Sequence, residues 1–228
     1  MTEPYELDAC AARDAISKSA LSPVELVSSC ISRIERVDPS LNAVVANCFN
    51  RALDEAKKAE RAVGSGVKLG PLHGLPILIK DLQDTKDLRT TYGSLLYKDH
   101  VPEKDESNVS VLREAGAIIL GKSNTPEFGA GAHTVNKVYG ATGNPFDTNR
   151  TCGGSSGGSA VALAANMVPL ASGSDSGGSL RIPAAYCGVV AHRSTPGIVP
   201  TERHSIGYTN YSVQGPMART VADTQLML

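Results

Sequence analysis

Apolar residues recur at helical spacing through the first third of the chain. Ser22-Pro23-Val24-Glu25 combines an N-cap residue, a proline at the first helical position and a glutamate three residues after the cap, which is typical of a helix start. The apolar positions that follow at helical spacing are Val27, Cys30, Ile31 and Ile34. Asp38-Pro39 then predicts the end of this helix, because proline interrupts the backbone hydrogen bonds. Residues 49–63 predict a second, more charged helix.

Beyond Gly66 the pattern changes to short apolar runs bounded by glycine and proline, which alternate with helices of small residues. The expected strands are residues 75–79, 117–120 and 168–171. The expected helices are residues 108–115 and 159–167, with another beginning at Pro183. Such alternation predicts an α/β fold with a buried sheet. We interpret residues 1–228 as a single domain with an N-terminal helical layer, 1–65, and a catalytic α/β core, 66–228.

The last residues predict a helix that starts near Thr220 and runs without a cap into Leu226-Met227-Leu228. We interpret this end as a domain that lacks its C-terminal portion. Apolar end residues without a partner, and a sheet without its later strands, favour aggregation and weak activity of this chain on its own.

Composition narrows the classes of function. Lys and Arg total 22 against 23 Asp and Glu, so the formal net charge of −1 gives no reason to expect a nucleic-acid partner. Aromatic residues make up 4% and tryptophan is absent, so the core must be packed from small and aliphatic side chains. The charge-free stretch 151–174 is long enough to cross a bilayer, but its Gly, Ser, Asn and Pro content disfavours a membrane helix.

The cysteines show neither C-x-x-C spacing nor closely spaced histidines, which disfavours a zinc site and a disulfide framework. They are Cys10, Cys30, Cys48, Cys152 and Cys187. Residues 1–4 carry neither the basic flank nor the apolar run of a secretory signal. Together these features favour a cytoplasmic protein.

Residues 116–123 match the phosphate-binding pattern G-x-x-x-x-G-K-[ST]. In a true phosphate-binding loop the strand precedes the loop, whereas here Ala117-Ile118-Ile119-Leu120 between the glycines is itself a strand core. We therefore reject a nucleotide site at this position.

Gly153-Gly154-Ser155-Ser156-Gly157 matches the nucleophile elbow G-x-S-x-G, and Asp175 with His192 or His204 would complete a Ser-His-Asp triad. An elbow serine follows a buried strand, but residues 148–152 are polar and typical of a turn. A hydrolase with Ser155 as nucleophile is therefore an alternative with weaker support.

Two loops rich in glycine and serine, residues 152–159 and 173–179, each open a short helix. Glycine lets such a loop turn tightly and present free amides at a helix N-terminus, where an oxyanion binds. Ser179 lies beside such amides, which suits an activated hydroxyl. Asp175 and Arg181 are expected to pair across the second loop and fix its shape.

A nucleophilic serine needs a base. Lys80 directly follows the apolar run 75–79. Burial disfavours the charged form of a lysine, so a drop of its pKa from ~10.4 to ~8 would give a usable base.

Three segments around these residues resemble the signature of the amidase signature family. They are Gly74-Leu75-Pro76-Ile77-Leu78-Ile79-Lys80-Asp81, Gly153-Gly154-Ser155-Ser156-Gly157-Gly158-Ser159-Ala160 and Gly173-Ser174-Asp175-Ser176-Gly177-Gly178-Ser179-Leu180-Arg181-Ile182-Pro183-Ala184-Ala185. The resemblance runs from the N-terminal helices to Leu228. It implies an α/β/α fold with a mixed buried sheet flanked by helices, and neither a metal nor an organic cofactor.

The resemblance also implies a Ser, cis-Ser, Lys triad, in which Ser179 is the nucleophile, Ser155 the bridging serine and Lys80 the base. It further implies an oxyanion hole formed by the backbone amides of Ser176, Gly177, Gly178 and Ser179. The stretch Gly129-Ala130-Gly131-Ala132-His133 falls on the pocket side, so Gly129, Ala130 and Gly131 are expected to bind substrate.

The expected function is an amidase that hydrolyses a linear carboxylic amide to an acid and ammonia or an amine. Its partner would be a small-molecule amide, without nucleic acid or membrane, and a homo-oligomer is left open. One alternative is the glutaminase subunit of a tRNA-dependent amidotransferase, although residues 129–133 lack the hydroxyl-rich Ser-Ser-Thr run typical of those subunits. Another alternative is a non-catalytic fragment or binding module.

Overall fold

A mixed sheet of six strands lies at the centre of the computed structural model, which describes residues 2–202 and 210–228. Its strands are β1 (Val44–Asn47), β2 (Pro76–Lys80), β3 (Ile118–Ser123), β6 (Leu170–Asp175), β7 (Val190–Ala191) and β8 (Val213–Ala218). Their order in the sheet is β1-β3-β2-β6-β8-β7. β2 runs parallel to both β3 and β6, whereas β1 pairs antiparallel with β3, and β8 antiparallel with both β6 and β7.

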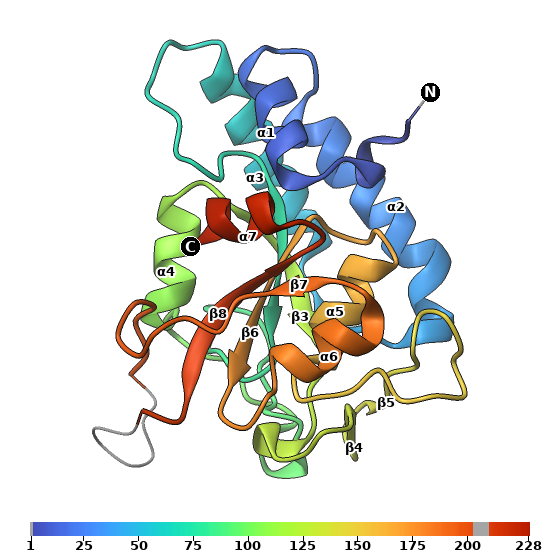
Figure 1. Ribbon diagram of the computed structural model, residues 1–228. Helices are drawn as coiled ribbons and strands as arrows, with labels where there is room; N and C mark the ends of the chain where they lie inside the picture. Colours follow the sequence, from blue (N-terminus) through green and yellow to red (C-terminus); the bar gives the residue numbers. More distant parts are fainter. Residues whose placement is uncertain (1, 203–209) are drawn as a thin grey trace.

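Helices flank this sheet on both sides, with α2 and α5 on one side and α4 on the other (Figure 1). The helices are α1 (Ala9–Ser17), α2 (Pro23–Leu41), α3 (Phe49–Val63), α4 (Ser107–Glu114), α5 (Gly157–Ala164), α6 (Arg181–Cys187) and α7 (Val221–Met227). The short elements are the 3-10 helices η1 (Pro4–Glu6), η2 (Leu95–Tyr97) and η3 (Glu127–Gly129), and the two-stranded sheet of β4 (Val135–Asn136) and β5 (Gly140–Ala141). The expected α/β fold with a mixed, helix-flanked sheet is confirmed.

The start of α2 is confirmed, but its predicted end is wrong. Ser22 Oγ accepts from the backbone N–H of Val24 at 3.0 Å, as an N-cap does. The helix continues through Pro39 to Leu41 and ends at Asn42, which has a left-handed φ of 55°. The N–H of Asn42 donates to the carbonyl oxygen of Asp38 at 2.8 Å. A proline in the last turn therefore removes one hydrogen bond without ending the helix.

Strands β1, β7 and β8 were not expected. β1 is a four-residue strand between two helices, and it joins the main sheet, so the segment 1–65 also contributes a strand. β8 contains Gly215 and Pro216, which disfavour a strand in a sequence pattern. The glycine is required by close packing, because a methyl group there would lie 2.2 Å from the carbonyl oxygen of His192.

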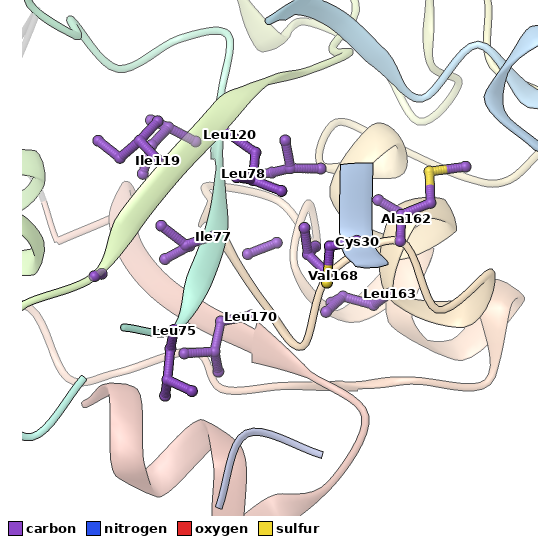
Figure 2. Close-up of a cluster of buried hydrophobic side chains, with 14 of the residues drawn as sticks. Cys30, Leu75, Ile77, Leu78, Ile119, Leu120, Ala162, Leu163, Val168 and Leu170 are labelled. Carbon is purple, nitrogen blue, oxygen red and sulfur yellow. The ribbon is translucent and has the colours of Figure 1, made fainter. Parts of the chain in front are cut away.

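The apolar core lies between the sheet and its helices, and it is built from aliphatic side chains, as the composition predicts. Figure 2 shows Leu78 beside Leu120 and, at the other end of the strand, Leu75 beside Leu170, all of them buried. β2 is buried along its whole length. The core therefore holds the carboxyl end of β2 in a fixed place.

The end of the chain is better packed than expected. Leu226 and Met227 are half-buried and pack against the core, and Leu228 alone of the three is exposed, at 53%. Thr220 Oγ1 accepts from the N–H of Asp223 at 3.1 Å and caps α7. The expectation that all three apolar end residues lack a partner is therefore wrong for the first two. In the described part of the chain, no helix has the length and apolarity needed to cross a membrane.

Candidate active site

Lys80 is the last residue of β2, and its side chain is completely buried at the carboxyl end of the strand. Its Nζ donates to three hydroxyls, Ser155 Oγ at 2.6 Å, Ser156 Oγ at 2.8 Å and Ser174 Oγ at 2.9 Å. The first two serines precede α5, and the third lies on β6, beside β2. The structure thus brings the predicted base and Ser155 into direct contact.

The surroundings of Lys80 favour its neutral form. Burial lowers the pKa of Lys80 to about 7, and the negative charge of Asp175 opposes this shift only in part. At neutral pH a substantial fraction of the amine is therefore unprotonated and able to accept a proton.

The first Gly/Ser loop enters α5 through a cis peptide bond between Gly154 and Ser155. Gly154 lies against the backbone of the segment 129–133, because a methyl group on it would lie 2.9 Å from the backbone nitrogen of His133. The N–H of Ser156 donates to the carbonyl oxygen of Ser179 at 3.1 Å. This bond ties the first loop directly to the second.

Ser179 lies between β6 and α6 and is half-buried. In the described part of the chain, no hydrogen-bond partner is found for its hydroxyl or for the backbone N–H groups of Ser176, Gly177 and Ser179. The N–H of Gly178, in contrast, donates to Asp175 Oδ1 at 2.8 Å. Three of the four amides expected in the oxyanion hole are therefore available to a ligand, and the fourth is engaged within the loop.

Asp175, at the end of β6, holds the shape of this second loop. Its carboxylate pairs with Arg181 at 3.0 Å and with Arg193 at 2.9 Å. Burial raises the pKa of Asp175, but hydrogen bonds from Arg181 and from the backbone N–H groups of Gly178 and Leu180 outweigh it and lower the pKa to about 2. The expected pair of Asp175 and Arg181 is confirmed.

Three further residues of the site were not predicted from the sequence, namely Ser156 and Ser174, which contact Lys80, and Arg193, which contacts Asp175. Both serines stand in the Gly/Ser loops, and their hydroxyls could have been considered as partners for a buried lysine. Arg193 lies outside the three signature segments, so only the fold shows that it contacts Asp175.

In the described part of the chain, neither Asp175 nor His192 is placed as the elbow alternative with Ser155 as nucleophile requires. Asp175 is engaged by two arginines, and His192 is exposed, with its backbone paired to Pro216 at 3.1 Å. His204 lies outside the described residues. Among the described residues, the side chain that contacts Ser155 Oγ is a lysine, Lys80, at 2.6 Å.

Of the predicted substrate-binding residues, Gly129 adjoins the site. A methyl group at Gly129 would lie 3.5 Å from Ser155 Oγ and 2.7 Å from Leu82 Cδ1. Ala130 and Gly131 follow on the exposed surface. The rejected phosphate-binding motif is mostly β3, as expected, and its Lys122 is fully buried.

Known proteins of one family resemble this chain in sequence and in fold. The amidase family model matches residues 25–228. An acylamidase of Rhodococcus erythropolis is 42% identical over 93% of this chain and 45% of its own length. A glutamyl-tRNA(Gln) amidotransferase subunit of Natranaerobius thermophilus is 40% identical over 98% of this chain and 46% of its own length.

Among solved structures, a bacterial aryl acylamidase of the amidase signature family superposes with a TM-score of 0.91 and 34% identity, over 97% of this chain and 46% of that one. The chain thus spans about half the length of the relatives it matches. The family model, the relatives and the shared fold together show that the chain belongs to the amidase signature family.

Proposed function

We propose that this protein is an amidase, which hydrolyses a carboxylic amide to an acid and ammonia or an amine through an acyl-enzyme on Ser179. In this proposal Lys80 is the base and Ser155 passes the proton between them. The observation that carries it is the fully buried Lys80 amine, with a pKa lowered to about 7 and 2.6 Å from Ser155 Oγ.

The hydrogen bonds around Lys80 support Ser155 as the proton carrier. A neutral amine keeps two N–H donors and one lone pair, so one of its three hydroxyl neighbours must donate to it. Ser156 Oγ already donates to the carbonyl oxygen of Ser174, at 3.3 Å. Of the two remaining hydroxyls, Ser155 is nearer to Nζ than Ser174 is.

The reaction then runs in two halves. Ser179 Oγ bonds to the amide carbon while its proton moves to Ser155 and the Ser155 proton moves to Lys80. The carbon–nitrogen bond breaks as the same path returns a proton to the leaving nitrogen, which departs as ammonia or an amine. Water next attacks the ester with the same general-base help, and the acid leaves Ser179.

The developing oxyanion would be bound by the free N–H groups of Ser176, Gly177 and Ser179. Such preorganised donors stabilise the tetrahedral intermediate by about 3–4 kcal/mol each where single donors have been removed. Gly178 supports them indirectly, because its N–H holds the loop to Asp175.

A panel of linear aliphatic, aromatic and amino-acid amides tests the proposal, with release of acid and amine measured for the wild type and for Ser179→Ala. We expect hydrolysis by the wild type and at least about a 10³-fold lower rate for the variant. Equal rates for both proteins would contradict the assignment of Ser179.

The similarity to glutamyl-tRNA(Gln) amidotransferase subunits supports a second candidate, a glutaminase that works with partner subunits. Glutamine in the same panel distinguishes the two. Hydrolysis of glutamine alone, stimulated by added partner subunits, would favour the second candidate over a stand-alone amidase.

A further inference from the structure

A second buried lysine lies outside the Lys80 cluster. Lys122, on β3, is fully buried and stands opposite Ile79 in the parallel pairing of β2 with β3. Its Nζ donates to the carbonyl oxygen of Gln83 and to Thr85 Oγ1, the latter at 2.9 Å. Lys122 thus binds the turn that directly follows Lys80.

That turn, residues 81–85, is closed by hydrogen bonds to two carbonyl groups. The N–H of Gln83 donates to the carbonyl oxygen of Lys80 at 3.0 Å, and Thr85 Oγ1 donates to the carbonyl oxygen of Gln83 at 3.1 Å. Lys122 adds its charged donor to the same carbonyl oxygen. Hydrogen bonds from a charged donor are about twice as strong as neutral ones, so Lys122 holds the Gln83 carbonyl more strongly than Thr85 Oγ1 does. The turn is also held through Asp84, whose N–H donates to Glu106 Oε2 at 3.2 Å.

The same turn holds the backbone of Lys80. Gln83 Oε1 accepts from Ser172 Oγ, and Ser172 Oγ accepts from the backbone N–H of Lys80 at 2.9 Å. A continuous set of buried hydrogen bonds therefore leads from Lys122 to Lys80 through Gln83 and Ser172.

The turn also places Leu82 at the edge of the active site. Leu82 Cδ1 lies 2.7 Å from where a methyl group on Gly129 would be, and Ser155 Oγ lies 3.5 Å from the same point. Displacement of the turn would therefore move both the base and an apolar side chain beside Ser155.

Acidic groups around Lys122 favour its charged form. Asp81 is buried and accepts from Thr91 Oγ1 at 2.6 Å. Burial lowers the pKa of Lys122 to about 8, and the negative charges that oppose the shift are Asp81, Asp84, Glu106 and Asp105. The ammonium form therefore predominates at neutral pH and keeps its donors.

We propose that Lys122 is a positioning residue for the amide hydrolysis proposed above. Its ammonium group fixes the turn of residues 81–85, and the turn fixes the base Lys80 and the side chain of Leu82 beside Ser155. The inference rests on that proposed function. In this role Lys122 sets the rate at which the serine is acylated and leaves the affinity for the acylating molecule unchanged.

The test is the saturation kinetics of labelling by an alkyl fluorophosphonate, measured for the wild type and Lys122→Met. The variant has a neutral side chain of similar length. We expect its maximal labelling rate to fall about tenfold or more, since small displacements of catalytic groups have effects of this size, with an unchanged half-saturating concentration. A maximal rate less than threefold below the wild-type rate would overturn the proposal.

Lys122→Met leaves the buried Asp81 without its counter-charge, so this variant could fail to fold. A second variant therefore tests the same contact in another way. Thr85→Val removes one acceptor of Lys122 Nζ while keeping the shape of the side chain. The change also removes the hydrogen bond from Thr85 Oγ1 to the Gln83 carbonyl oxygen. We expect a maximal rate about threefold or more below wild type, because Lys122 Nζ keeps one of its two hydrogen bonds to the turn. A smaller decrease in Thr85→Val would also overturn the proposal.

Ile119→Ala is the matched control, because Ile119 lies on the same strand in the apolar core (Figure 2). It lowers the melting temperature through a cavity, yet its folded fraction should be labelled at the wild-type rate. An equal rate loss in this control would assign the effect of Lys122 to general destabilisation and overturn the proposal.

The same experiment separates this inference from the proposed function. A wild type that forms no serine adduct contradicts the proposed function, and the role of Lys122 falls with it. Labelling of the wild type at Ser179, with unchanged rates in Lys122→Met and Thr85→Val, overturns only the role of Lys122.

Discussion

Lys80 and Lys122 are fully buried lysines on neighbouring parallel strands, yet their surroundings differ. Among the described residues, Lys80 Nζ hydrogen-bonds to three uncharged hydroxyls, and the counter-charge that acts on it is Asp175. Lys122 meets a carbonyl oxygen and a hydroxyl, and four acidic residues act on it. Burial lowers the pKa of both, to about 7 for Lys80 and about 8 for Lys122.

The comparison teaches that burial alone does not make a lysine a base. Burial disfavours the charge of both amines, and the neighbours decide how much of that cost is recovered. Hydroxyls solvate an ammonium group, but they also exchange protons with the neutral amine, as a relay requires. Carboxylates instead keep an ammonium group charged, which suits an anchor for a turn.

The largest expected effect is that of Lys80→Met. Loss of the base should lower the maximal rate of fluorophosphonate labelling by about 10²–10⁴, or more if the triad acts as a unit. His192→Ala is the matched control, and its rate should stay close to that of the wild type because His192 is exposed and outside the site. If His192→Ala were as damaging as Lys80→Met, a histidine-based triad would be favoured instead.

Asp175→Asn is expected to have the next largest effect. The change leaves Arg181 and Arg193 without their shared carboxylate and loosens the loop that carries Ser179, so labelling should slow about 10–10²-fold. Because Asp175 raises the pKa of Lys80, the variant should also show a lower apparent pKa in the dependence of labelling on pH. A profile that moves to higher pH would contradict the assigned direction.

The two lysines also predict how stability depends on pH. Their folded-state pKa values lie below those of an unfolded chain, so between about pH 7 and 10 the unfolded state binds more protons and the free energy of unfolding rises with pH. Each lysine contributes at most about 1.4 kcal/mol per pH unit. Denaturant titrations from pH 6 to 8, below the range in which unfolded cysteines ionise, should show a steeper rise in the wild type than in Lys80→Met. Equal slopes for the two proteins would refute the buried, neutral Lys80.

Gly129→Ala has the smallest expected effect. The added methyl group would press on Leu82 Cδ1, and φ at Gly129 is +70°, where a side chain is strained by about 1 kcal/mol or more. We expect labelling to slow severalfold, with a weaker half-saturating concentration, because the methyl group also lies beside Ser155. Gly64→Ala, at the exposed end of α3 where an added methyl group meets open space, serves as the control and should label normally.

Elements whose signals are local could be predicted from the sequence. The cap at Ser22, the helix Phe49–Val63 and the strand that leads to Lys80 each follow from periodicity and capping within a few residues. Strands β1 and β8 could not be predicted in this way. Their existence depends on pairing partners far along the chain, and in β8 Gly215 is needed because the carbonyl oxygen of His192 packs against it.

The residues of the candidate site also differ in whether a local sequence signal predicts them. Lys80, Ser155 and Ser179 stand in segments that resemble a family signature, so their proximity could be anticipated. Arg193 and the network of Lys122 could not, because nothing near them in the sequence indicates that they meet Asp175 or the turn after β2. The phosphate-binding pattern around Lys122 gives no hint of the turn that this lysine binds.

Peptide mapping of the fluorophosphonate adduct by mass spectrometry tests the central claim most directly, because it identifies the nucleophilic serine as the one that bonds to phosphorus when fluoride leaves. The account predicts an adduct on Ser179 in the wild type and none in Ser179→Ala. An adduct on Ser155 would contradict it and restore the elbow alternative, and an unlabelled wild-type protein would contradict the acyl-enzyme itself.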